Sequence, residues 1–80
     1  TMISAIFPAD CKILIKISEF VCAYAQKLPL TSEQIYEIDL AVDEAATNII
    51  DHAYRNLPQG DIRIKLDHTD TGMTITLERR

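Results

Sequence analysis

Residues 40–54 read LAVDEAATNIIDHAY, and this stretch predicts the central element of the molecule. Its apolar residues recur at spacings of three and four, which is the signature of an amphipathic helix. The helix is expected to begin upstream, where Thr31 and Gln34 fit a capping box, and to run to Ala53. Its predicted buried series consists of Ile35, Ile38, Val42, Ala45 and Ile49.

A polar stripe lies opposite this apolar series. On a helical projection Asn48, Asp51 and Arg55 fall within about 40° of Glu44, and Glu37 extends the stripe backward. Such a face is what an ordinary surface helix shows, and periodicity leaves that interpretation open. Two features favour a binding site instead. An exposed face does not require Asn48, a poor mid-helix residue, and the neighbouring alanines leave room for a ligand.

The chain before this helix predicts a strand and a second helix. Residues 2–7 suit a short strand that ends at Pro8, which cannot continue a hydrogen-bonded ladder. Asp10–Lys27 is expected to be an amphipathic helix with Asp10 as its cap, closed by Pro29. The apolar positions of this helix are Leu14, Ile17, Val21, Tyr24, Ala25 and Leu28.

The chain after the central helix predicts a β-hairpin. A loop over Arg55–Gly60 leads to the segment Asp61–His68, in which apolar and polar residues alternate strictly. Residues 69–72 turn the chain, and Met73–Glu78 repeats the alternation, so one face of the hairpin is buried and the other is wet. Residues 1–80 thus predict one α+β domain of order β-α-α-β-β. Its expected architecture is a two-layer sandwich with the helices on one face of a mixed or antiparallel sheet.

Composition excludes several classes of function. The net charge of −4 and pI of about 4.9 disfavour a direct grip on nucleic acid. No apolar run approaches the roughly 20 residues of a membrane span, so we expect a cytoplasmic protein. Cys11 and Cys22 would lie roughly 16 Å apart along one helix, too far for a disulfide. Neither they nor His52 and His68 show the spacing of a metal site.

The run Glu44-Ala45-Ala46-Thr47-Asn48, continued by residues 49–54, resembles the N-box of the GHKL (Bergerat-fold) ATPases, which include gyrase and the histidine kinases. It is most similar to the N-box of the anti-sigma factor serine/threonine kinases. Those chains also begin with a strand, a helix and a link similar to residues 28–34, and they continue through a glycine to two strands. The resemblance spans nearly all 80 residues and implies the N-terminal part of a Bergerat-type fold.

The resemblance implies a role for four residues of the central helix. Asn48 would hold the Mg²⁺ ion that bridges the phosphates of ATP, and Glu44 would be the base that takes a proton from an attacking hydroxyl. An amide oxygen suits a hard cation, and a carboxylate one turn away can orient or deprotonate a nucleophile. Asp51 and His52 would contact phosphate or support the pocket. A packed or surface imidazole remains the alternative for His52.

Two parts of the family pattern are missing from residues 1–80. The Asp-x-Gly-x-Gly box that reads adenine and the glycine-rich lid over the phosphates would follow the second hairpin strand, where this sequence reaches Glu78-Arg79-Arg80. We therefore expect these residues to be the N-terminal part of a longer protein. Alone they should bind ATP poorly and be inactive.

The function implied for the intact protein is ATP-dependent phosphorylation of a small anti-sigma antagonist on a serine or threonine, together with binding of a sigma factor. Formation of a homodimer is implied as well. Two alternatives stay open. One is a non-catalytic module that binds proteins or dimerises, for which the strand at 2–7 offers a free edge. The other is the catalytic domain of a sensor histidine kinase.

Overall fold

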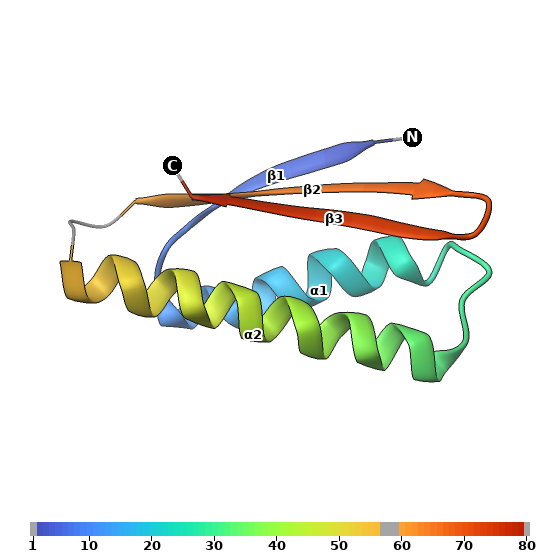
Figure 1. The fold of residues 1–80 in the computed structure, drawn as a ribbon, viewed down its shortest axis with the longest axis horizontal. Helices are drawn as coiled ribbons and strands as arrows, with labels where there is room; N and C mark the ends of the chain where they lie inside the picture. Colours follow the sequence, from blue (N-terminus) through green and yellow to red (C-terminus); the bar gives the residue numbers. More distant parts are fainter. Residues whose placement is uncertain (1, 57–59, 80) are drawn as a thin grey trace.

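The structure, a computed structural model, describes residues 2–56 and 60–79, and for residue 11 and residues 52–56 it describes the backbone only. Its elements are β1 (Ile3–Pro8), the 3-10 turn η1 (Cys11–Ile13), α1 (Leu14–Ala25), α2 (Ser32–Asn56), β2 (Asp61–Thr69) and β3 (Gly72–Arg79). Both helices lie on one face of the sheet (Figure 1), so the predicted α+β sandwich is confirmed. Within the described residues, neither helix has the length and apolar character needed to cross a membrane.

The sheet is antiparallel throughout, with the strand order β1-β2-β3. β1 comes from the beginning of the chain and pairs with β2 from Ile3 opposite Leu66 to Pro8 opposite Asp61. The predicted hairpin is confirmed, since β2 and β3 pair over almost all of their lengths. β2 is therefore the central strand and the only one of the three with a neighbour on both sides.

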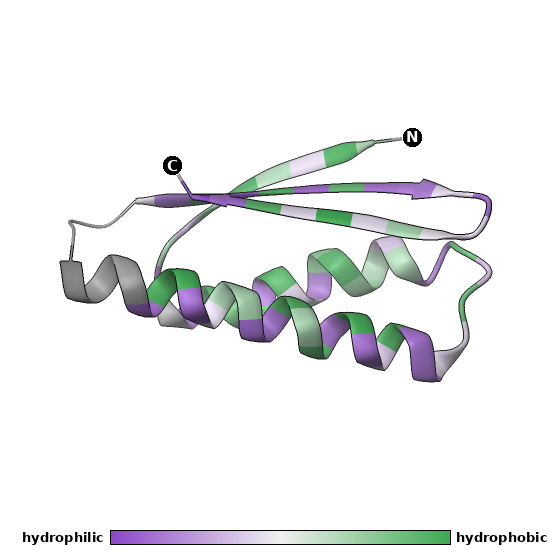
Figure 2. Ribbon diagram, in the orientation of Figure 1, coloured by the Kyte–Doolittle hydropathy of each residue, from purple (hydrophilic) through white to green (hydrophobic). Residues whose placement is uncertain are grey.

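The core lies between the inner face of β2 and the two helices. Ile62, Ile64 and Leu66 alternate along β2, and each has 0% of its surface exposed. The helices contribute Ile17, Val21, Tyr24, Ala25, Val42, Ala46 and Ile50. Figure 2 shows the alternation of hydrophobic and hydrophilic positions along the strands that produces this arrangement.

Both predicted helix caps are present. Asp10 has an extended backbone, and its Oδ1 accepts the backbone N–H of Lys12 at 3.0 Å. At the beginning of α2 the capping box is reciprocal: Gln34 N–H donates to Thr31 Oγ1 at 3.0 Å, and Thr31 N–H donates to Gln34 Oε1 at 2.9 Å. These bonds satisfy backbone donors that have no partner inside the helix.

Several predicted boundaries are wrong. β1 includes Pro8, which was expected to end the strand, and β2 and β3 extend to Thr69 and Gly72, inside the predicted turn. The helix expected over Asp10–Lys27 begins instead as the 3-10 turn η1, a tighter start that is frequent at helix N-termini, and its α-helical part ends at Ala25. The central helix continues to Asn56, three residues past Ala53, so the backbone of Arg55 is helical rather than loop. The sequence offers no helix breaker between Ala53 and Pro58, which explains the extension.

The buried face of α2 also differs from the prediction. Val42, Ala46 and Ile50 are buried, whereas Ala45 and Ile49, predicted to be in the core, are half-buried. The buried seam is thus shifted by about 60° around the helix axis. The shift arises because α2 packs against α1 as well as against the sheet, and the periodicity of a single helix carries no information on the second contact.

The helices leave β3 partly uncovered. Met73, Ile75 and Leu77 point to the helix layer as predicted, but all three remain half-buried. α2 is the helix that contacts β3, but the inner face of β3 receives less cover than that of β2. An apolar strip therefore stays accessible between α2 and β3.

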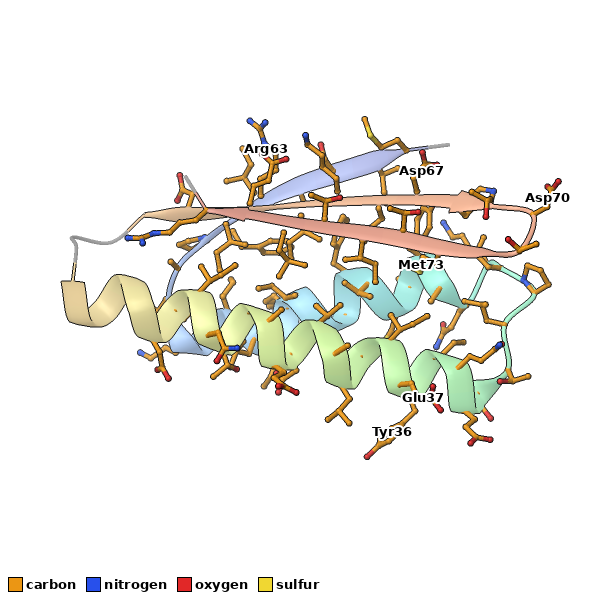
Figure 3. The ribbon with its side chains drawn as sticks, viewed as in Figure 1. Tyr36, Glu37, Arg63, Asp67, Asp70 and Met73 are labelled. Atoms are coloured by element: carbon orange, nitrogen blue, oxygen red, sulfur yellow. The ribbon has the colours of Figure 1, made fainter. Side chains whose placement is uncertain are left out.

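The outer face of β2 and β3 is polar. Lys65 on β2 forms an ion pair with Glu78 on β3, with Nζ and Oε1 2.7 Å apart. Figure 3 shows Arg63 and Asp67 on this same face, away from the helices. The alternation that places Ile64 and Leu66 inside therefore places charged residues outside, which confirms that one face is wet.

We predict that Ala46→Leu lowers the free energy of unfolding by about 1–3 kcal/mol, because its extra carbon atoms have no space in a closed core. Ala46 has 0% exposure. Ala23→Leu is the matched control, since Ala23 is exposed on α1 and its replacement should change stability by less than about 0.5 kcal/mol. Urea denaturation measures both. Equal midpoints for the two variants would contradict the placement of α2.

Candidate functional site

The predicted site residues lie on the exposed face of α2. Glu44, Asn48 and Asp51 are exposed, and no hydrogen bond or ion pair to any of them is found among the described residues. The backbone of His52 is part of α2, but its side chain lies outside the described residues. The three described side chains are therefore available to a ligand.

The spacing along α2 brings these three side chains to one face. Glu44 and Asn48 are one helical turn apart, with about 5–6 Å between Cβ atoms, and Asp51 is a further turn along. Their donors are an amide oxygen and two carboxylates, the hard oxygen ligands that Mg²⁺ prefers. Among the described residues no three histidine, cysteine, aspartate or glutamate side chains converge. Mg²⁺ commonly takes one or two protein ligands besides substrate phosphates, so the donor set fits a phosphate-bound ion.

A groove of about 320 Å³ runs between α2 and the beginning of β3. It is lined by Leu30, Gln34, Glu37, Ile38, Ala41, Thr71, Gly72 and Met73. Neither Glu44 nor Asn48 is among its lining residues. They follow Glu37 and Ala41 by seven residues each, so they continue the same rows of the helix two turns further on. The apolar strip of β3 continues in that direction.

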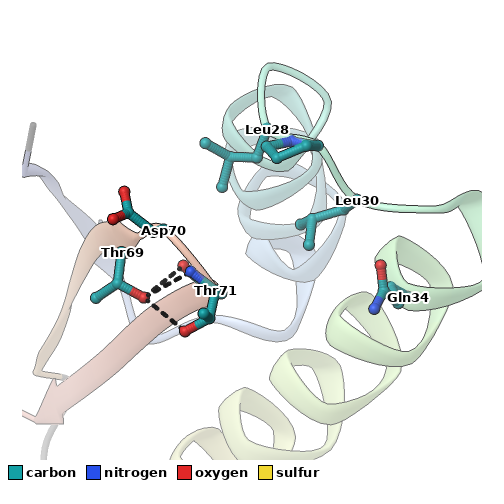
Figure 4. Close-up of a pocket in the computed structure, with 8 residues that line it drawn as sticks. Leu28, Leu30, Gln34, Thr69, Asp70 and Thr71 are labelled. Atoms are coloured by element: carbon teal, nitrogen blue, oxygen red, sulfur yellow. Dashed lines mark hydrogen bonds between the residues drawn. The ribbon is translucent and has the colours of Figure 1, made fainter.

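A smaller cavity of about 80 Å³ lies where the α1–α2 link meets the hairpin turn (Figure 4). Three of its polar side chains are already bonded locally. Gln34 is held by the capping box, and Thr69 Oγ1 lies 3.4 Å from both the N–H and the Oγ1 of Thr71. This cavity therefore closes the end of the α2–β3 groove and offers few free groups of its own.

A third cavity, of about 330 Å³, lies at the end of the sandwich between α1 and the sheet. Its lining residues are Ile3, Tyr24, Lys27, Leu28 and His68. The Oη atom of Tyr24 lies 2.9 Å from Nδ1 of His68. Burial, and secondarily the carboxylate of Asp67, raises the pKa of the Tyr24 hydroxyl.

Sequence reasoning missed this third cavity. Tyr24 was predicted only as a core residue, and His68 was considered only as a metal ligand. One signal was present: His68 occupies the next inward position after Ile62, Ile64 and Leu66, so the alternation of β2 directs it to the helix side. Its meeting with Tyr24 depends on the packing of α1, which the sequence does not reveal.

A polar contact also joins the two helices. Ser18 Oγ on α1 donates to Asp39 Oδ1 on α2 at 2.6 Å. Half-buried Cys22 lies beside them, and burial, with the Asp39 charge as the next cause, raises the pKa of its thiol. A raised pKa leaves less thiolate, so Cys22 is a poor nucleophile and acts as packing material between the helices.

Comparison with known proteins identifies a family and several relatives. The histidine kinase-like ATPase domain family matches residues 7–78. An anti-sigma F factor of Clostridium botulinum is 37% identical over 57 residues, which cover 71% of this chain and 40% of the relative. An anti-sigma F factor of Clostridium beijerinckii is 35% identical over 57 residues, with the same coverage of 71% and 40%. The chain thus spans about two-fifths of the length of these relatives.

We predict that Tyr24 ionises above pH 10.0, its ordinary pKa, because the folded protein disfavours the phenolate. The stability that this group contributes is complete below that pH and is lost as pH rises through the raised value. In a pH titration, the absorbance at 295 nm that wild type gains and Tyr24→Phe does not should therefore have its midpoint above pH 10. Tyr36→Phe, which alters an exposed tyrosine, is the control and should leave this late phase intact. A midpoint at or below 10 contradicts the burial of Tyr24.

Proposed function

Since this chain belongs to the histidine kinase-like ATPase family, we propose that it forms the magnesium side of an ATP site in an anti-sigma regulatory protein with serine/threonine kinase activity. The observation that carries the proposal is the exposed set Glu44, Asn48 and Asp51 on α2, inside the segment that the family match covers. Glu44 and Asn48 continue the helix rows of the groove residues Glu37 and Ala41. Among the described residues, no hydrogen bond or ion pair to Glu44, Asn48 or Asp51 is found.

Each residue has one role in this proposal. Asn48 would hold Mg²⁺ through its amide oxygen, and the ion would offset the negative charge of the phosphates. Glu44, one turn away, would accept the proton of the attacking hydroxyl. Asp51 and His52 would complete the phosphate end of the site. α2 is a rigid 25-residue helix, which keeps the first three side chains at fixed spacing.

The position of β3 supports an ATP site on this side of the molecule. Figure 1 shows the end of β3 on the same side as the C-terminal half of α2, where Asn48 and Asp51 lie. Residues that follow β3 in an intact protein would therefore begin close to the proposed site. We propose that they supply the adenine-binding aspartate and the lid, and that residues 1–80 alone are inactive.

The relatives are named anti-sigma F factors, which supports protein partners. We propose that the intact protein binds a sigma factor and phosphorylates a small antagonist protein on a hydroxyl side chain in the cytoplasm. The net charge of −4 argues against direct contact with nucleic acid.

A second candidate function is protein binding without catalysis. β1 is an edge strand of the described sheet; Ile6 within it is 49% exposed, and Met2 just before it is 59% exposed. Such an edge can pair with a second copy to form a homodimer, or with another protein. Nucleotide binding distinguishes the two functions. An ATP site requires Asn48, whereas a module that binds proteins only through β1 does not.

We predict that Asn48→Ala weakens binding of a fluorescent ATP analogue by about 10- to 100-fold in the full-length protein with Mg²⁺. Loss of one bond to a charged group costs about 1.5–3 kcal/mol. Asp43→Ala is the matched control, since Asp43 is exposed on α2 but lies on a different side of the helix. Equal affinities of wild type and Asn48→Ala would remove the assignment of Asn48.

We predict that Glu44→Ala retains the nucleotide but transfers phosphate about 10²–10⁴ times more slowly, the usual contribution of a general base. Transfer from labelled ATP to the antagonist protein measures the rate. Glu33→Ala, which alters an exposed glutamate in the first turn of α2 outside the groove, should transfer at the wild-type rate. If Glu44→Ala also transfers at that rate, Glu44 is not the base.

A further inference from the structure

The cavity between α1 and the sheet has the size and composition of a small-molecule site. Its volume is about 330 Å³, at the lower end of the roughly 300–1,000 Å³ typical of ligand pockets. Ile3 and Leu28 form apolar walls, and Tyr24, Lys27 and His68 bring polar groups to the same space. The beginning of β1 and the end of β2 meet the last turn of α1 at this end of the molecule (Figure 1).

The contact between Tyr24 and His68 fixes which ring nitrogen can serve a ligand. The Tyr24 hydroxyl and Nδ1 of His68 lie 2.9 Å apart and form a hydrogen bond, so Nδ1 is engaged with Tyr24. The other ring nitrogen, Nε2, is the one left to contact a ligand. Among the described residues no hydrogen bond to Nε2 is found.

Lys27 adds a positive charge to the same cavity. Among the described side chains, no carboxylate lies within ion-pair distance of the Lys27 ammonium group. The carboxylate of Asp67 is, after burial, the second cause of the raised pKa of Tyr24. It lies on the outer face of the sheet (Figure 3), and its Oδ1 accepts the backbone N–H of His68 at 2.8 Å. The sheet thus separates this carboxylate from the cavity.

We propose that this cavity binds a small carboxylic acid with an apolar chain or ring. The apolar part would lie against Ile3 and Leu28, and the carboxylate would accept from the Lys27 ammonium and from Nε2–H of His68. The site is separate from the proposed ATP site, because none of its residues belongs to α2 or to the α2–β3 groove. It would give the protein a second ligand of a different chemical class.

The test is a titration of the ¹⁵N-labelled full-length protein with phenylacetate, followed by NMR. Saturable shifts should appear at the amides of residues 3, 24, 27, 28 and 68, with and without Mg²⁺-ATP. Phenylacetamide has the same shape without the charge and should bind at least about tenfold more weakly. Absence of saturable shifts at these residues, or equal affinity for the two probes, overturns the proposal.

Two variants separate the cavity from non-specific binding. Lys27→Gln should weaken phenylacetate at least about fivefold, whereas Lys16→Gln should bind it normally, because Lys16 is an exposed lysine of α1 outside the cavity. Ile3→Trp should fill the cavity and abolish binding while ATP-analogue affinity stays unchanged. Wild-type affinity in both Lys27→Gln and Ile3→Trp overturns the proposal. The proposal is also overturned if the amide shifts of residues 3 and 24 change on dilution of the protein but not on addition of the probe. A second copy of the chain would then cover the site.

Discussion

The burial of the inner face of β2 is the constraint on which the rest of the structure depends. Ile62, Ile64 and Leu66 are fully enclosed, and each contributes about 1.5–3 kcal/mol relative to an exposed side chain. β2 is also the only strand of the described sheet with two neighbours. Both outer strands pair with this nine-residue segment, and core side chains of both helices pack against its inner face. Among the described residues, the other fully enclosed large side chains are Ile17 and Val21 of α1.

The same constraint determines where ligand sites can form. Two helices cover the inner face of β2 but leave β1 and β3 only half-covered, and the α2–β3 groove arises on the β3 side of the helix layer. The cavity around Tyr24 and His68 arises at another limit of that layer, where α1 stops before the sheet does. The polar stripe of α2 points away from the core because Val42, Ala46 and Ile50 are held against it.

Local signals in the sequence were sufficient for most of the fold. The capping box of Thr31 and Gln34 and the alternation of the hairpin depend on residues close in sequence, and both are confirmed. The rotation of α2 was not predictable, because it depends on contact with α1. That Glu44, Asn48 and Asp51 share a face followed from helical periodicity alone. The Tyr24–His68 cavity brings together three distant segments, and no local pattern reports such a meeting.

The ion pair between Lys65 and Glu78 has a consequence for how other molecules can approach the sheet. A protein that covered the outer face would have to dehydrate these two charges, and Arg63 and Asp67 beside them, at a cost that can exceed their mutual attraction. A third layer on that side is therefore disfavoured. Any complex formed there would be wet, dominated by polar contacts and weakened by added salt.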